Sequence, residues 1–282
     1  MLRTRILTAL VMLPLFLAAL FWFPNWAWDA FTLAIVLVAC HEWLQFCGFP
    51  PRHAAVYRVI TIAMSLMLAG LYLQTQQPFL MERTAQVLFV LAALFWLIVV
   101  PFWLARGWKS LSPWAVGIAG WIVIFPTWAA FLLIHDSSPW LLLTLMIIVF
   151  AADIGAYFAG RAFGKTKLAP KVSPNKTWEG VMGGLVLVMA YFLGWFTALK
   201  YISDAAWSAP LLAFGVWLPL IFLALAGMSV LGDLYESWMK RSVGVKDSGT
   251  LLPGHGGVLD RIDALTAALP MAGLLIYVLP KP

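Results

Sequence analysis

Long apolar stretches alternate with short polar connections over the whole chain. A helix needs about 20 mostly apolar residues to cross a bilayer, and Pro24 breaks one long apolar run into two. We therefore predict an all-α, polytopic membrane helix bundle that forms a single membrane domain over 1–282. The nine predicted spans are 6–23, 27–47, 54–73, 85–105, 114–134, 139–160, 181–201, 210–232 and 262–280.

Composition agrees with a membrane protein. Of the 282 residues, 63% are apolar and 11% are charged, whereas soluble domains are about 25% charged. The net charge of +6 would suggest nucleic acid as a partner of a soluble protein. In a membrane protein, the same basic residues are better explained as cytoplasmic anchors beside anionic lipid or as phosphate ligands, so no nucleic acid is expected.

The distribution of Lys and Arg predicts the orientation. Alternate connections place 15 of these residues on one side of the membrane and three on the other, namely Arg83, Lys200 and Lys281. Because positive residues are enriched on the cytoplasmic side, we expect a cytoplasmic N-terminus and a C-terminus outside.

Two connections are longer than the rest, at about 161–180 and 233–261, and both fall on the predicted cytoplasmic side. They hold nine of the 18 basic residues. Long polar segments between helices often carry function, so we expect the chemistry there.

Three aspartates lie where the second segment meets the membrane. Asp233 ends the eighth span, and Asp260 and Asp263 begin the ninth on a shared helix face. Clustered carboxylates need a positive partner, and oxygen ligands suit Mg²⁺. Alternatively, Asp260 caps the ninth helix with Asp263 in its first turn. That alternative leaves Asp233 unexplained, because an anion at a helix C-terminus opposes the helix dipole.

A glycine-rich turn, Pro253-Gly254-His255-Gly256-Gly257, follows the basic residues Lys240, Arg241 and Lys246. Glycines permit positive φ and let backbone N–H groups approach an anion closely. As a plain surface turn with membrane anchors, the segment would be unremarkable. The combination with carboxylates favours a site for a metal ion and a polyphosphate.

The spacing of these residues resembles the signature of phosphatidate cytidylyltransferases, also called CDP-diacylglycerol synthases. The matching blocks are Ser237-x-x-Lys240-Arg241, Lys246-Asp247-Ser248-Gly249, Pro253-Gly254-His255-Gly256-Gly257 and Asp260-Arg261-Ile262-Asp263. A second stretch, Ser173-Pro174-Asn175-Lys176-Thr177-x-Glu179-Gly180, is also similar to that family, although Asn175 departs from its pattern.

The resemblance implies an enzyme of phospholipid biosynthesis that transfers a cytidylyl group from CTP to phosphatidic acid and releases pyrophosphate. It implies Mg²⁺ on Asp233 and Asp260, and it is compatible with a second cation and a homodimer. The residues implied in the reaction are Lys240, Arg241, Lys246, Asp247, His255, Arg261 and Asp263. Those implied in substrate or cofactor binding are Asp153, Ser173, Lys176, Thr177, Glu179, Gly256 and Gly257. The expected location is the bacterial cytoplasmic (inner) membrane, among its lipids.

Two other classes compete with this interpretation. A secondary transporter could use Glu42 and Asp153 for ion coupling, but we find no inverted repeat in the sequence. A lipid-linked phosphoryl enzyme such as a polyprenol kinase is the nearer alternative. For His41 and Glu42, at the middle of the second predicted span, we favour a structural polar contact over a proton path.

Overall fold

The computed structural model describes residues 2–73, 78–106, 112–202 and 205–279. This part of the chain is almost entirely helical. The long helices are α1 (Leu2–Trp22), α2 (Asn25–Cys47), α3 (Pro51–Leu73), α4 (Pro78–Leu94), α6 (Pro113–Ser137), α7 (Pro139–Phe163), α8 (Trp178–Ala198), α10 (Leu218–Ser242) and α11 (Leu259–Tyr277). The short ones are the π-helical turn η1 (Phe95–Val99), α5 (Val100–Arg106), α9 (Ala209–Leu212) and the 3₁₀ turns η2 (Leu199–Tyr201), η3 (Ala206–Ser208) and η4 (Gly215–Trp217).

Eight of the predicted spans coincide with long helical segments, the fourth being the continuous run of α4, η1 and α5. The eighth, 210–232, is displaced: α10 runs from Leu218 to Ser242, so Asp233 lies within this helix and the prediction that it ends the span is wrong. Seven of these segments are long and apolar enough to cross a membrane. The other two are α1, whose apolar part is the shorter Leu7–Trp22, and α11, which carries three charged residues in its first turn and a half. The polytopic helical bundle is confirmed, while the count of nine spans stays a prediction.

Prolines and hydroxyl caps set several helix boundaries. Pro24 is extended, as the predicted break requires, and α2 follows it. The side chains of Ser112, Ser138 and Thr177 accept hydrogen bonds from the first turns of α6, α7 and α8. Such caps satisfy backbone N–H groups that have no partner within the helix.

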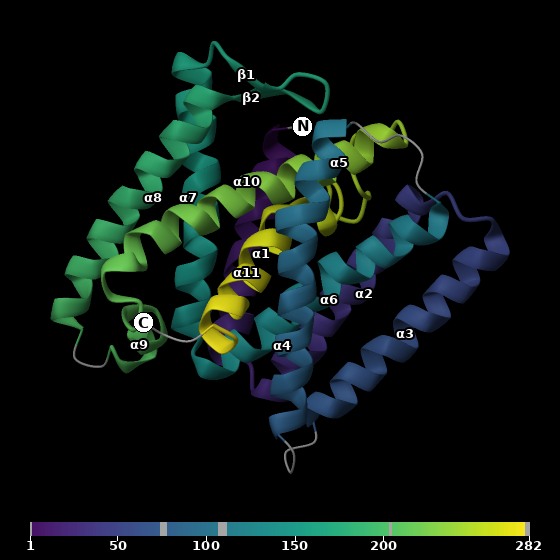
Figure 1. Cartoon of the computed structure of the whole chain (residues 1–282), viewed down its shortest axis with the longest axis horizontal. Helices are drawn as coiled ribbons and strands as arrows, with labels where there is room; N and C mark the ends of the chain where they lie inside the picture. Colours follow the sequence, from purple (N-terminus) through teal and green to yellow (C-terminus); the bar gives the residue numbers. More distant parts are fainter. Residues whose placement is uncertain (1, 74–77, 107–111, 203–204, 280–282) are drawn as a thin grey trace.

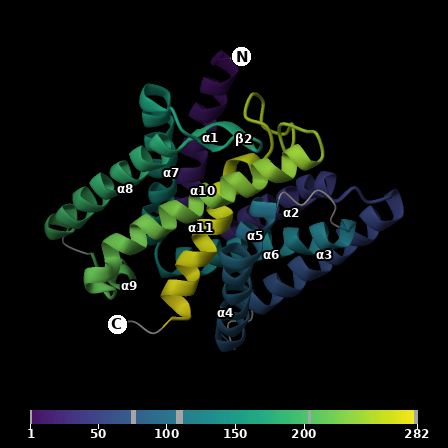
Figure 2. The ribbon, with the colours of Figure 1, turned by 45° about the horizontal axis from the view of Figure 1, so that its top comes forward.

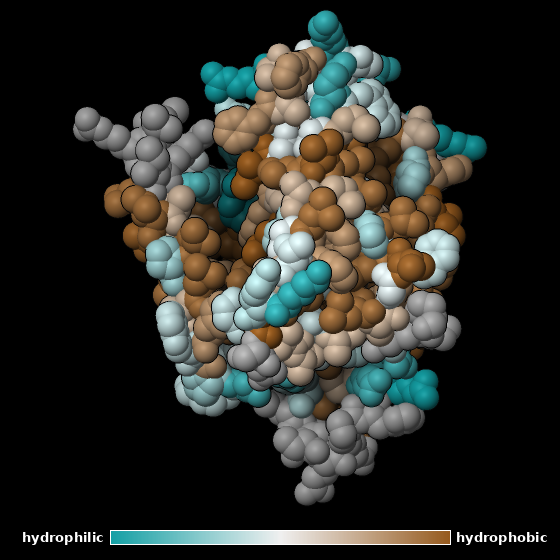
Figure 3. Space-filling model, turned by 90° about the vertical axis from the view of Figure 1, so that its left-hand side faces the viewer, coloured by the Kyte–Doolittle hydropathy of each residue, from teal (hydrophilic) through white to brown (hydrophobic). Residues whose placement is uncertain are grey.

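The centre of the bundle is built around α6, with α2 and α11 packed against it (Figure 1). Its largest fully buried side chains include Trp28, Trp43, Trp128 and Tyr235. By contrast, α3 and α8 lie on opposite flanks with largely exposed apolar faces (Figure 1). The α8 flank is mostly hydrophobic along its height, with hydrophilic residues gathered towards the top and bottom (Figure 3). This is the surface expected of a protein surrounded by lipid.

Small residues bring α7 and α8 into very close contact, as the spacing of Ala152, Ala156 and Gly160 along α7 favours. A Cβ atom added to Gly184 would lie 2.6 Å from the carbonyl oxygen of Ala152, and one added to Gly155 would lie 2.6 Å from that of Gly183. The two backbones therefore touch directly, with no room for larger side chains between them.

One end of the bundle gathers the polar segments. The start of α1, the segment between α7 and α8, and the segment between α10 and α11 all lie at this end (Figures 1 and 2). The segment between α7 and α8 contains a small antiparallel hairpin that the sequence did not predict, β1 (Lys167–Ala169) with β2 (Ser173–Thr177). The two segments predicted to carry the chemistry are thus neighbours in space. The C-terminus is expected on the outer side of the membrane. Its last residues, Lys281 and Pro282, lie beyond the described residues.

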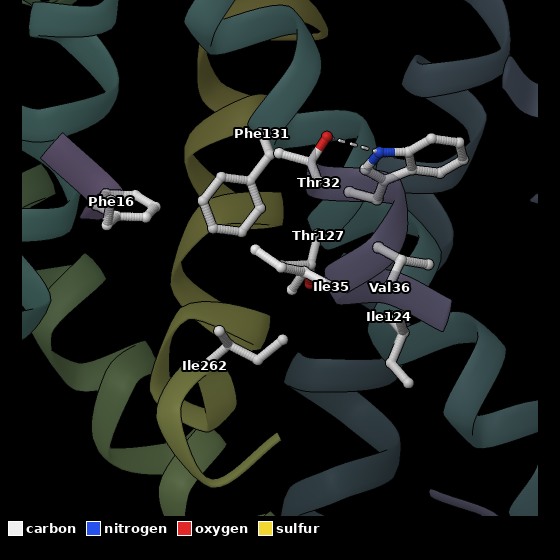
Figure 4. Close-up of a pocket in the computed structure, with 9 residues that line it drawn as sticks. Phe16, Thr32, Ile35, Val36, Ile124, Thr127, Phe131 and Ile262 are labelled. Carbon is white, nitrogen blue, oxygen red and sulfur yellow. Dashed lines mark hydrogen bonds between the residues drawn. The ribbon is translucent and has the colours of Figure 1, made fainter. Parts of the chain in front are cut away.

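A small apolar cavity lies among α1, α2, α6 and α11 (Figure 4). Its volume is only about 10 Å³, enough for one water at most. The nearby hydroxyl of Thr32 accepts a hydrogen bond from Trp128 Nε1 at 3.2 Å, so its polar group is already satisfied. This cavity is a packing gap, and the candidate site lies elsewhere.

Candidate active site

The last turns of α10 and the start of α11 bring the predicted acids together. Gly232 makes this possible, because a Cβ atom there would lie 2.6 Å from the carbonyl oxygen of Asp263. Asp233, Glu236 and Lys240 follow at helical spacings of three and four, so they share one face of α10. Two groups of charged side chains form at this crossing.

The first group is centred on the Lys240 ammonium. Its Nζ lies 2.6 Å from Glu236 Oε2 and 2.6 Å from Asp260 Oδ1. The three side chains are only 11%, 3% and 5% exposed, so these ion pairs are shielded from water. A buried ammonium between two carboxylates fixes α10 against α11.

Asp260 also connects this group to the loop between α10 and α11, residues 243–258, which we call the signature segment. Its Oδ2 accepts hydrogen bonds from Ser248 N at 2.8 Å, from Ser248 Oγ at 2.9 Å and from Gly257 N at 2.8 Å. Since Oδ1 is paired with Lys240, both oxygens of this carboxylate are bonded to protein donors. Asp260 therefore holds the glycine-rich turn to the helix crossing.

The second group contains the other acids. Lys176 Nζ lies 2.6 Å from Asp233 Oδ2, with the two side chains 24% and 30% exposed. Asp153, which is exposed, interacts electrostatically with Asp233, Lys176 and Arg261. Asp263 interacts in the same way with Asp233. Three carboxylates from α7, α10 and α11 therefore lie within electrostatic range of one another or of Lys176 and Arg261, and we call these five residues the acid cluster.

The acid cluster has the donor chemistry for a magnesium ion. Carboxylate oxygens are the ligands Mg²⁺ takes in proteins, and the buried Glu236 Oε1 beside the cluster has no hydrogen-bond partner. As arranged here, no three metal-ligating side chains of the described residues surround one point. Asp233 and Asp263 fit the ion by the chemistry of their oxygen donors, and Asp233 as a ligand stays a prediction. Asp260 as a metal ligand stays a prediction, because its present partners are Lys240, Ser248 and Gly257.

The N-terminus of α11 is capped by a residue from the other half of the chain. Val258 N donates to Glu42 Oε1 at 3.0 Å, and Leu259 N donates to Glu42 Oε2 at 2.8 Å. The alternative in which Asp260 is the N-cap is therefore wrong, because α11 already begins at Leu259. Gln45 Nε2 also donates to the Ser248 carbonyl oxygen. Through Glu42 and Gln45, the end of α2 therefore holds the signature segment at two places, at Ser248 and at the start of α11.

The placement of Glu42 at the middle of a span is wrong, although the structural polar contact favoured for it is confirmed. Glu42 is buried five residues before the end of α2. Its partners lie more than 200 residues away in sequence, so no local pattern predicts them. The sequence indicates only that Glu42 is an acid within an apolar run, and such an acid needs a polar partner.

We expect Glu42→Ala to destabilise the protein by at least about 2 kcal/mol, because the backbone N–H groups of Val258 and Leu259 lose their acceptor. Melting in detergent measures the loss, and limited proteolysis of the 243–258 segment reports its release. Glu42→Gln, which keeps one acceptor oxygen, should lose less. Glu82→Ala, an exposed acid on α4, is the matched control. Equal melting of the Glu42→Ala and Glu82→Ala variants would contradict the capping role.

The second motif stretch serves mainly to position Lys176. The Glu179 carboxylate accepts hydrogen bonds from Lys165 N and Thr166 N, each at 3.1 Å, and Thr177 Oγ1 accepts one from Gly180 N. These bonds tie the β1–β2 hairpin to the start of α8. Ser173 is half-buried in β2 and forms no side-chain hydrogen bond with the acid cluster in the described part of the chain, so its role in binding stays a prediction.

The remaining predicted residues surround the two charged groups. Lys246, Asp247 and Arg261 are exposed, and Arg241 donates from Nη1 to the Val245 carbonyl oxygen at 3.0 Å. His255 is half-buried, and its Nδ1 has no hydrogen-bond partner.

The glycine turn has the positive φ predicted for it. Gly254 and Gly256 have φ of +77° and +82°. A Cβ atom at Gly257 would lie 2.5 Å from both Glu42 Oε2 and Ser248 Oγ. The N–H of Gly257 was expected to face phosphate, but here it donates to Asp260.

Comparison with known proteins agrees with these features. The model of the cytidylyltransferase family matches residues 3–279. Phosphatidate cytidylyltransferase of Pseudomonas aeruginosa is 37% identical, covering 98% of this chain and 97% of that protein. The protein of the same name from Haemophilus influenzae is 38% identical over 96% of both chains, and that of Brucella suis is 35% identical over 100% of this chain and 95% of its own. With the match extending over nearly the full length, the chain belongs to the cytidylyltransferase family.

Proposed function

We propose that this protein transfers the cytidylyl group of CTP to phosphatidic acid, giving CDP-diacylglycerol and pyrophosphate. The observation that carries the proposal is the 2.6 Å contact between Lys176 and Asp233, which joins the two motif stretches in one acid cluster. The names of the relatives support the same substrates, and neither the transporter nor the polyprenol kinase is favoured.

The chemistry needs charge compensation more than a base. The phosphate monoester of the lipid has a second pKa near 6, so most of it is already a dianion at pH 7 and can attack without losing a proton to a side chain. Lys176 and Arg261 at the acid cluster, with Lys246 and Arg241 nearby, reduce its repulsion from the triphosphate. Mg²⁺ held by Asp233 with Asp263 or Asp260 would neutralise phosphate charge when bound. No nucleophilic side chain is required.

A direct assay tests this proposal. Purified protein receives CTP labelled in its α-phosphate, Mg²⁺ and phosphatidic acid in detergent. A labelled lipid product is expected. Label that remains water-soluble under these conditions would refute the reaction, and a lipid labelled instead from the γ-phosphate of a nucleotide would indicate a lipid kinase.

We further propose that the protein is a multi-pass protein of a bacterial cytoplasmic membrane with its two motif segments in the cytoplasm. The basis is the 15-to-3 distribution of Lys and Arg. Cysteine labelling of right-side-out cells should miss a reporter near Ser248, at the exposed Thr250, and reach one added beyond Pro282. The opposite pattern would contradict this topology.

Exposed cations of the signature should be needed for turnover. We expect Lys246→Ala or Arg241→Ala to lower kcat/KM about ten- to hundred-fold, because a charge-assisted hydrogen bond to phosphate contributes about 1.5–3 kcal/mol. Both side chains are exposed, so melting in detergent should stay unchanged. Wild-type kcat/KM in folded variants would remove these residues from the site.

A further inference from the structure

A cavity lies where the signature segment meets α2. It has a volume of about 590 Å³ and is bounded by α2, through Leu37, His41, Glu42 and Gln45, and by the signature residues Gly249 and Thr250. Both carboxylate oxygens of Glu42 are bonded to backbone N–H groups at the start of α11. A second cavity of about 170 Å³ lies between α2 and α3. Leu37 and His41 line both, so the two adjoin, and we call them together the α2–α3 cavity.

Two basic side chains face this cavity at the same depth. His41 is six residues before the end of α2 and Arg58 is seven residues after the start of α3. With a rise of 1.5 Å per residue, they lie about 9 and about 10 Å from the helix ends. The two helices are packed side by side, so His41 and Arg58 are level with one another. Both are exposed.

An arginine at this depth requires a partner. A charged side chain facing the apolar part of a bilayer is costly unless it is paired or reaches water. Neither Arg58 nor His41 forms an ion pair with another residue in the described ranges. A planar guanidinium binds phosphate through two parallel hydrogen bonds, so an anionic phosphate is the ligand whose chemistry fits.

The other walls favour a lipid as the source of that phosphate. Below the level of His41 and Arg58 the lining is mostly apolar, with Leu37 on α2 and Ile62 on α3, and the hydroxyl of Thr61 there already accepts a hydrogen bond from Trp121 Nε1. Ile62 is itself exposed on the outer face of α3. A free phosphate would leave these apolar walls unused, whereas a phospholipid places its head at the basic pair and its acyl chains along the helices.

We propose that the α2–α3 cavity is a docking site for the phosphate monoester head of the lipid substrate, held by Arg58 and His41. This inference rests on the proposed function. The site is distinct from the acid cluster, because none of the five acid-cluster residues lines either cavity. A lipid docked there lies against the loop that Asp260 holds.

Substitution of the basic pair tests the docking site. Arg58→Gln should raise the KM for phosphatidic acid about ten-fold or more, as expected for a lost charge-assisted bond, and His41→Gln should raise it less. The KM for CTP and the kcat at saturating lipid should stay near wild type. Arg52→Gln, which removes the same charge from the first turn of the same helix, is the matched control. An Arg58→Gln variant that keeps the wild-type KM for phosphatidic acid would overturn the inference.

Native mass spectrometry of the detergent-purified protein gives a readout independent of turnover. The wild type should retain phosphatidic acid in preference to phosphatidylcholine, and Arg58→Gln should lose this preference. Displacement of the lipid by millimolar inorganic phosphate, or equal retention of both lipids, would overturn docking of a lipid monoester. If the wild type forms no labelled lipid product, the proposed function alone is refuted. If the wild type forms product but Arg58→Gln retains phosphatidic acid as well as the wild type does, the docking site alone is refuted.

Discussion

Replacing Asp233 by asparagine should nearly abolish cytidylyl transfer and leave the melting temperature within a few degrees of wild type. Asn keeps the size of the side chain and one oxygen but removes the charge expected to hold Mg²⁺. The loss of stability should be small, because the Lys176–Asp233 pair is 24% and 30% exposed and such pairs contribute at most about 1 kcal/mol. Turnover measured against Mg²⁺ concentration should recover in part at high Mg²⁺.

Asp136→Asn is the control for this experiment. Asp136 is exposed near the end of α6, where it accepts a hydrogen bond from Tyr72, so the same chemical change should leave turnover unaffected. Near-normal activity of Asp233→Asn at low Mg²⁺ would exclude Asp233 as a metal ligand.

Asp260→Asn should lower both turnover and stability. Asp260 pairs with Lys240 and accepts three hydrogen bonds from Ser248 and Gly257. Loss of the charge weakens these bonds within a shielded group and should cost about 2–3 kcal/mol. Melting in detergent measures this loss, and the transfer assay should show at least a hundred-fold decrease.

Mg²⁺ separates the two roles that Asp260 could have. If it binds the ion, high Mg²⁺ should restore part of the activity of Asp260→Asn. If it acts by holding the glycine turn, activity should stay low at every Mg²⁺ concentration while the melting temperature falls. A variant with normal activity and normal melting would contradict both roles, and Asp136→Asn again provides the matched control.

The bundle itself follows from the sequence because lipid leaves few alternatives. Backbone groups in a bilayer must be paired internally, so an apolar run of about 20 residues specifies a helix almost regardless of its neighbours. The proline at position 24 marks a helix boundary for an equally local reason. Most of the helix positions could therefore be predicted without knowing how the helices pack.

The arrangement of the site depends on contacts between distant segments, which local patterns do not encode. Asp260 and Asp263 share a helix turn, yet one pairs with Lys240 and the other interacts with Asp233. Which of the two aspartates lies near Lys240 and which near Asp233 depends on where α10 crosses α11. Glu42 caps α11 across more than 200 residues. The β1–β2 hairpin was missed because its strands are short and polar, without an alternating apolar pattern.

The direct backbone contact between α7 and α8 also bears on how the protein is made. These helices are neighbours in the chain, so their contact is able to form as soon as α8 enters the membrane, before α10 and α11 have entered. The helical hairpin then already holds Asp153 within electrostatic range of Lys176. The carboxylates of α10 and α11 enter later, against a cation already in place. If the helices insert in this order, the carboxylates of α10 and α11 do not enter the bilayer without a positive partner.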